Sequence, residues 1–206
     1  MRRTFAISDW FFMLSHRFKR NRVAVLIYAL LCLLFLVIGI AIGVNISDKA
    51  GYALKNGAVI FAFLRGERSA FTYFLIDALL TLLYALFAAS MFFFKVMPFL
   101  SVAPCLYKAY SLGMQSSIII IVYSASSLPM LFVLFIPAHV VSIIVLCILS
   151  RKCFEFSAIN GRCSPSRADI AAYYKSLIPY ALIIIACSLV TTVTVTLFGS
   201  ALIGVI

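Results

Sequence analysis

Long apolar stretches separated by short polar segments dominate the sequence. Five of them are long enough, or nearly long enough, to cross a bilayer: residues 23–44, 71–94, 108–124, 128–149 and 177–198. The first has no charged residue and corresponds to about 33 Å of helix at 1.5 Å per residue. Lipid offers the backbone no hydrogen-bond partners, so such segments cross it as helices. The pattern predicts an all-α, polytopic transmembrane helix bundle with about five spans.

Prolines mark the expected interruptions of these helices. Residues 96–107 are apolar but too short to span, and they contain Pro98 and Pro104. Proline lacks a backbone donor and clashes with the preceding turn. We therefore expect a re-entrant or interfacial connector there, and a further helix break at Pro137 in the fourth span. The third span is the least apolar, because serines, a glycine and a glutamine fill its first half.

The chain divides into two regions. Residues 1–22 form a basic leader in which Trp10 and Phe18 lie on the apolar side of a predicted amphipathic helix. We expect this leader to lie on the cytoplasmic face of the membrane. Residues 23–206 form a single transmembrane helical domain. Its largest outer loop, about residues 45–70, carries the basic side chains that we expect to contact partners: Lys55, Arg65 and Arg68.

Composition and charge support this interpretation and assign an orientation. The chain is 65% hydrophobic and only 11% charged, with a mean hydropathy of +1.16. Its net charge of +11 does not indicate nucleic-acid binding, because the basic residues flank the spans. Thirteen of the 17, Lys108 among them, lie on the side that carries the N-terminus. The positive-inside rule places the N-terminus in the cytoplasm and the C-terminus on the outer side of the membrane. The first span is too long for a signal peptide's apolar region, so we expect it to remain as an anchor.

Motifs that would indicate catalysis or a cofactor are missing from the sequence. It has no H-E-x-x-H, no G-x-S-x-G and no phosphate-binding glycine loop. Its two histidines, His16 and His139, are far apart, and Cys153 and Cys163 lack a C-x-x-C partner. We expect a protein that is not an enzyme and binds no metal or cofactor, with its six cysteines acting as small apolar residues.

Two ionisable residues fall within predicted spans. Asp77 is near the outer end of the second span, where it either carries a function, reaches the outer interface or pairs locally. His139 follows Pro137 near the middle of the fourth span. It either satisfies a polar group that the proline leaves free or takes part in a proton relay. We favour the structural role for His139, because a relay normally needs more titratable groups.

Small residues at four-residue spacing indicate close helix packing. Such pairs occur in the first, second and fifth spans: Gly39 and Gly43, Ala85 and Ala89, and Ser200 and Gly204. The threonines of the fifth span alternate in a way typical of a strand. In lipid we instead expect a helix whose threonine hydroxyls bond back to its own carbonyls, at Thr191, Thr192, Thr194 and Thr196.

The order of these features resembles one membrane-protein family. A basic aromatic leader (SDWFFMLSHRFKRNR), a first span with G-x-x-x-G, a proline-broken connector (MPFLSVAPCLYKAYSLG) and a proline-bearing fourth span (LFVLFIPAHVV) follow one another. This layout is similar to the stage II sporulation protein M family, from about Ser8 to the C-terminus. The resemblance implies a non-catalytic membrane scaffold. In spore formers such a scaffold recruits the peptidoglycan-degrading stage II sporulation proteins D and P during engulfment.

Two functions of different classes remain open at this point. The first is a membrane scaffold or anchor, itself able to form an oligomer, that holds other membrane or extracytoplasmic proteins. The second is a transporter, or the permease subunit of an export or import system, because broken helices near the middle of the membrane are typical of transport sites. The missing inverted repeat favours the scaffold.

Overall fold

The computed structural model of the chain is helical throughout the part that it describes. It describes residues 22–47, 69–93, 98–123, 128, 131–160 and 166–203, and no strand occurs within these ranges. The prediction of an all-α protein is therefore confirmed. The leader before residue 22 and the loop residues Lys55, Arg65 and Arg68 lie outside the described residues.

Five long helices form the body of the structure: α2 (Arg22–Ser47), α5 (Ala70–Ser90), α6 (Ala103–Tyr123), α8 (Ile136–Asn160) and α10 (Ile178–Ile203). Shorter elements join them or extend them: 3-10 helices at Met91–Phe93 and Pro98–Val102, a π-helical turn at Leu131–Phe135, and α9 (Arg167–Lys175).

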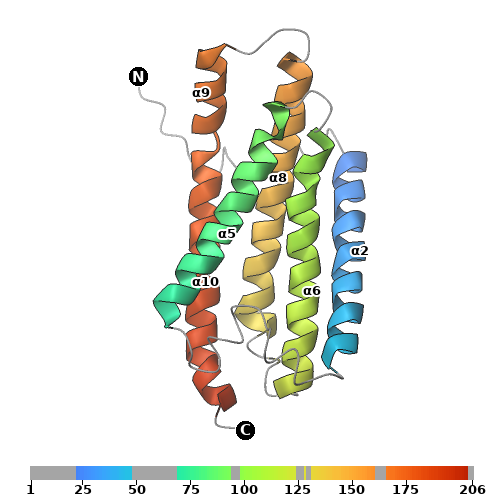
Figure 1. The fold of residues 1–206 in the computed structure, drawn as a ribbon, viewed down its shortest axis with the longest axis vertical. Helices are drawn as coiled ribbons and strands as arrows, with labels where there is room; N and C mark the ends of the chain where they lie inside the picture. The colour runs from blue at the N-terminus through green and yellow to red at the C-terminus, as the bar shows by residue number, and fades with distance from the viewer. Residues whose placement is uncertain are drawn as a thin grey trace.

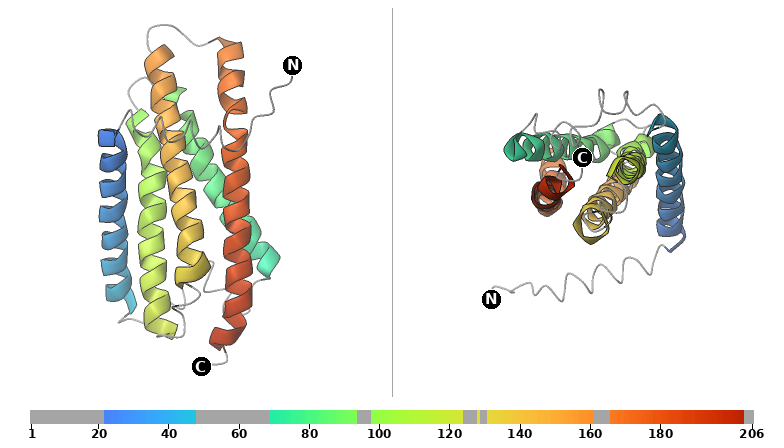
Figure 2. Two further views of the ribbon diagram at one scale, coloured as in Figure 1. Left: turned by 180° about the vertical axis from the view of Figure 1, so that it is seen from behind. Right: turned by 90° about the horizontal axis from the view of Figure 1, so that it is seen from below.

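The long helices lie side by side (Figures 1 and 2). α2, α6 and α8 stand in a row, α5 crosses the bundle obliquely, and α10 packs against α5 and α8. α9 continues upward from α10 in Figure 1. Successive long helices run in opposite directions, so α6 starts at the end of the bundle where α5 stops. This alternation is the one expected of a chain that repeatedly crosses a membrane.

Four helical stretches are long and apolar enough to cross a membrane: Leu26–Asn45, Ala70–Phe93, Ile136–Ser157 and Arg167–Leu197. The structure is thus compatible with a multi-pass membrane protein. α6, the third span of the sequence-based prediction, is not among the four, although its 21 residues make it as long as α5. α6 lies between α2 and α8 (Figure 1), and its polar residues Lys108 and Ser117 are buried against protein. Neighbouring helices therefore replace lipid around the polar part of α6.

The proline-rich connector differs from its prediction. We expected helix breaks at Pro98 and Pro104, in a connector that reached to residue 107. In the structure a 3-10 helix begins at Pro98, and α6 begins at Ala103 with Pro104 as its second residue. The first turn of a helix needs no backbone donor, so a proline there starts a helix and does not break it. Pro137 does coincide with a change of helix type. The π-helical turn Leu131–Phe135 ends two residues before it, and α8 begins at Ile136 with Pro137 as its second residue.

Glycines allow α2 and α6 to lie in close contact. A Cβ atom added to Gly39 would overlap the carbonyl oxygen of Tyr110, and one added to Gly43 would overlap the Ser117 hydroxyl. From the other side, a Cβ on Gly113 would overlap the carbonyl oxygen of Leu36. The structure thus places Gly39 and Gly43 at the contact with α6, where small residues let two backbones meet.

A cluster of aromatic rings packs together the ends of α5, α8 and α9. The ring of Phe92 stands edge-on to the rings of Phe156 and Tyr173, with centroids 4.7 and 5.1 Å apart. The Tyr173 hydroxyl donates a hydrogen bond of 2.9 Å to the carbonyl oxygen of Ala89. Ala85 and Ala89 are both buried, which agrees with a packing role for their face of α5. At the start of α9, Ser166 and Asp169 form a reciprocal capping box.

The threonines of α10 bond as predicted. Each hydroxyl donates to the carbonyl oxygen four residues earlier, at distances of 2.7 to 3.0 Å, in the residues Thr191, Thr192, Thr194 and Thr196. This confirms the prediction that the segment is a helix whose threonine hydroxyls bond back to its own carbonyl oxygens. Ser200 lies in α10, but its side chain and Gly204 are outside the described residues.

We predict that Gly39→Leu forces α2 away from α6. The leucine side chain would have to displace the backbone of α6 at Tyr110, so the free energy of unfolding should fall by about 1–3 kcal/mol. Denaturant titration in mixed micelles measures this loss. Ala41→Leu is the matched control, because Ala41 is exposed on the same helix and its substitution should be nearly neutral. Equal stability of the two variants would contradict a close α2–α6 contact.

Candidate functional site

An ion pair joins α5 to α6 inside the bundle. The ammonium nitrogen of Lys108 lies 3.2 Å from Oδ1 of Asp77 and 2.9 Å from Oγ1 of Thr81. Only 9% of the Lys108 side chain and 19% of the Asp77 side chain are exposed. Asp77 and Thr81 are four residues apart, so they present adjacent side chains on one face of α5. Lys108 thereby bonds to two groups of a neighbouring helix.

His139 of α8 lies near this pair. It is close enough to Asp77 and to Lys108 for its charge to interact with theirs. Its Nδ1 is 3.1 Å from the carbonyl oxygen of Phe135, and its ring stacks on the Phe135 ring with centroids 4.4 Å apart. The imidazole therefore bonds to a carbonyl of the π-helical turn that precedes it. This position corresponds to the structural role that we favoured for His139.

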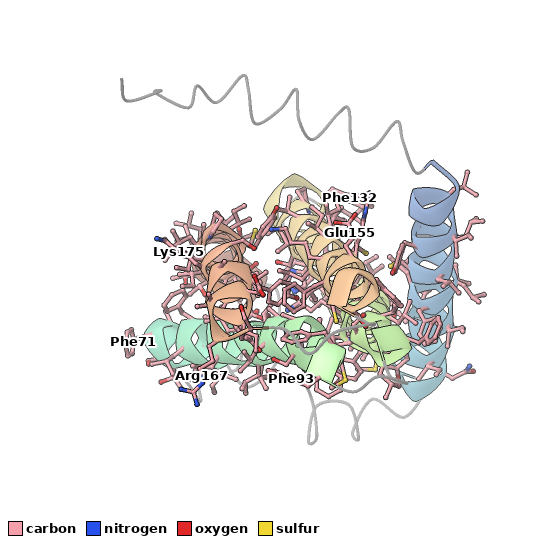
Figure 3. All side chains as sticks on the ribbon, turned by 90° about the horizontal axis from the view of Figure 1, so that it is seen from above. Phe71, Phe93, Phe132, Glu155, Arg167 and Lys175 are labelled. Carbon is pink, nitrogen blue, oxygen red and sulfur yellow. The ribbon has the colours of Figure 1, made fainter. Side chains whose placement is uncertain are left out.

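Four helices contribute polar groups to this interior region. α10 adds Ser188, whose side chain is buried and lies near the Asp77 carboxylate. α8 adds Ser142, which donates to the carbonyl oxygen of Ala138 at 3.1 Å. We call Asp77, Thr81, Lys108, His139 and Ser188 the polar centre. Figure 3 looks down the bundle and shows side chains of α5, α8 and α10 meeting between the helices.

The energetics of the polar centre depend on burial. Removing a carboxylate and an ammonium from water costs several kcal/mol for each ion, and their mutual attraction offsets this cost only when the geometry is good. Here the two ions are 3.2 Å apart, and the Thr81 hydroxyl is an additional partner of Lys108. An isolated charge at either position would keep the desolvation cost and lose the attraction.

The position of Lys108 corrects the sequence analysis. We counted Lys108 among the basic residues that flank the spans on the cytoplasmic side, and we considered local pairing for Asp77. The structure instead buries Lys108 inside α6 and pairs it with an acid 31 positions earlier. Because α6 begins at Ala103, Lys108 lies more than one turn inside the helix. Without Lys108, twelve basic residues flank that side, so the charge asymmetry persists.

A second group of side chains gathers where α2, α6 and α8 meet. The sulfur of Cys105 is 3.3 Å from that of Cys32 and 2.8 Å from that of Cys147. All three sulfurs lie within 4.8 Å of one another, which is close enough to ligate one metal ion. Cys105 is fully buried, and the other two are half-buried. From the sequence we expected these cysteines to act as separate apolar residues. Cys105 is 73 positions from Cys32 and 42 positions from Cys147, and such long intervals form no recognisable motif.

The glycine contact also includes residues that the sequence analysis missed. On α6, Gly113 and Ser117 lie against α2, and Ala109, which precedes them at the same four-residue spacing, is buried. This spacing is the same signal that singled out Gly39 and Gly43. The sequence-based prediction did not use this spacing on α6, because it considered residues 111–117 only as the polar half of the least apolar span.

Comparisons of the chain with protein-family models, curated proteins and solved structures found no match.

We predict that neutralising one member of the ion pair destabilises the protein and that neutralising both restores most of the loss. Asp77→Asn or Lys108→Met alone should lower the free energy of unfolding by about 3–5 kcal/mol, because one buried charge stays unpaired. The double variant Asp77→Asn/Lys108→Met should lie much closer to the parent. A double-mutant cycle from unfolding in mixed micelles yields the coupling energy.

The exposed pair of Arg151 and Glu155, 2.9 Å apart on α8, provides the control. Glu155→Gln should cost less than about 0.5 kcal/mol, because exposed ion pairs contribute little. Additive effects of the Asp77 and Lys108 substitutions would show that the two charges do not stabilise each other.

Proposed function

We propose that this protein is a non-catalytic membrane scaffold. The observation that carries the proposal is that the ionisable groups of the polar centre bond to one another and to the helices around them. Asp77 bonds to Lys108, Lys108 also bonds to Thr81, and His139 bonds to the carbonyl oxygen of Phe135. Groups used in this way hold helices in place, which suits a protein that acts by presenting a rigid surface.

The resemblance to the stage II sporulation protein M family supports the choice of partners. Under this proposal the scaffold sits in a bacterial cell membrane and holds peptidoglycan-degrading proteins, the stage II sporulation proteins D and P in a spore former, during engulfment. Its outer loop, with Lys55, Arg65 and Arg68, contacts them. The layout of spans and prolines in the sequence supports this assignment.

A transporter or permease subunit is the second candidate, and one observation favours it. Three titratable side chains from three helices, Asp77, Lys108 and His139, lie within electrostatic reach of one another in the interior. Ionisable groups inside membrane bundles mark ion and proton pathways in many transporters. A proton-coupled transporter would need at least one of these groups to change its charge during the cycle.

A complementation assay separates the two candidates. The variant Asp77→Asn/Lys108→Met removes both charges yet leaves no charge unpaired, and His139→Gln removes the remaining titratable group. For a scaffold we expect both variants to support the cellular function at 50% or more of the parental level and to co-purify the same proteins. Charge reversals at Lys55, Arg65 or Arg68 should instead abolish co-purification, because they alter the outer surface. Membrane abundance of each variant, measured by immunoblot, is the control.

The opposite pattern would support the transporter. In that case the double variant or His139→Gln would abolish function at normal abundance and with normal co-purification, while the loop variants stayed active. Co-purification of an ATPase in place of wall hydrolases would likewise contradict the scaffold.

The proposed orientation generates a separate prediction. Both ends of the bundle can be marked: Ala168→Cys lies in the exposed first turn of α9, beside its intact cap, and Ser69→Cys lies at the exposed start of α5. With the N-terminus in the cytoplasm, a membrane-impermeant maleimide should label Ser69→Cys in intact cells and Ala168→Cys only after permeabilisation. Both variants carry Cys163→Ser to remove a native loop thiol. Labelling of Ala168→Cys in intact cells would reverse the orientation.

A further inference from the structure

The three thiols at the junction of α2, α6 and α8 form a cluster that the scaffold proposal does not use. Their sulfurs form a triangle with edges of 3.3 Å (Cys32–Cys105) and 2.8 Å (Cys105–Cys147), and a third edge no longer than 4.8 Å. Each thiol comes from a different helix. An arrangement of this kind requires three helix positions to be correct at once, whereas a lone buried cysteine requires only one.

The dimensions of the triangle suit a metal ion. A metal with sulfur bonds of about 2.3 Å in a trigonal plane holds its ligands roughly 4.0 Å apart. The sulfurs can reach that spacing when Cys32 and Cys147, which are only half-buried, rotate outward by about 1 Å each. Cys105 is fully buried and forms the corner that both other thiols share.

The ligand set selects the kind of ion. Thiolates are soft ligands that prefer Cu(I) and zinc over magnesium, calcium or manganese. Structural zinc takes four ligands, whereas this group has three members among the residues that the structure describes. The Cys105 thiol also donates to the carbonyl oxygen of Ile143 at 3.8 Å.

We propose that Cys32, Cys105 and Cys147 form a three-sulfur binding site for a soft monovalent cation, Cu(I) in particular. The thiols bind as thiolates, so each one that becomes a ligand releases its proton to solvent as the ion enters. Tyr28 of α2 lies near Cys105 and Cys147.

The bound ion would join three helices. α2 packs mainly against α6, and Cys147 brings α8 to the same point. Because the ion binds the folded arrangement and not the unfolded chain, saturation should raise the unfolding temperature. The bound ion would thus link α2, the first helix of the described structure, to α6 and α8.

A competition titration tests the site. The full-length protein in detergent micelles, reduced and free of oxygen, is titrated with Cu(I) supplied as its bicinchoninate complex. We expect one Cu(I) per chain to transfer from the dye to the protein. Cys32→Ser and Cys147→Ser should each weaken binding at least tenfold, and X-ray absorption should count three sulfur neighbours around copper. Cys105→Ser removes a fully buried thiol and can misfold. In that case the affinities of Cys32→Ser and Cys147→Ser, which change half-buried positions, test the site.

Other cysteines of the chain provide matched controls. Cys153 and Cys187 lie outside the triangle, and replacing each by serine should leave stoichiometry and affinity unchanged. The proposal is overturned if the folded, reduced protein takes no Cu(I) from the dye. It is equally overturned if Cys153→Ser weakens binding as much as Cys147→Ser does. These outcomes do not depend on the scaffold proposal, because the readout is metal transfer alone.

Discussion

The exclusion of water from the space between the helices is the constraint on which the rest of this structure depends. A polar group placed there keeps its desolvation cost unless the protein itself supplies a partner. Lys108 meets this requirement with Asp77 and Thr81, and His139 meets it with a backbone carbonyl. The threonines of α10 meet it within their own helix. For these residues, a hydrogen-bond partner supplied by the protein replaces the water that the bundle excludes.

The same constraint accounts for the central position of α6. α6 is the long helix of the described structure that falls outside the four candidate spans, and lipid would be a poor solvent for its lysine, serines and glutamine. Its backbone is instead covered by α2 through glycine contacts, and its lysine is covered by α5. The helix least suited to lipid therefore lies where the other helices surround it, as Figure 1 shows for its place between α2 and α8.

Features that depend on short intervals of sequence were predicted well. The helical class, the outline of the long helices and the threonine bonds of α10 follow from runs of apolar residues and from i to i+4 geometry. The start of α6 was not predicted, because we interpreted proline as a helix breaker. Proline is also favoured in the first turn of a helix. The partner of Asp77 and the meeting of Cys32, Cys105 and Cys147 were not predictable. Each depends on helix neighbours and rotations that no short interval encodes.

The burial of Lys108 has a consequence for how the chain enters the membrane. Moving a lone lysine to the centre of a bilayer costs about 2.5–3.5 kcal/mol, which a helix as weakly apolar as α6 recovers poorly. Synthesis, however, delivers α2 and α5 before α6, so the glycine face and the carboxylate that α6 needs are already present when it emerges. α6 can then leave the translocation machinery as the third member of an assembling group, with its charge neutralised on arrival. The order of helices along the gene is in this sense also an order of assembly.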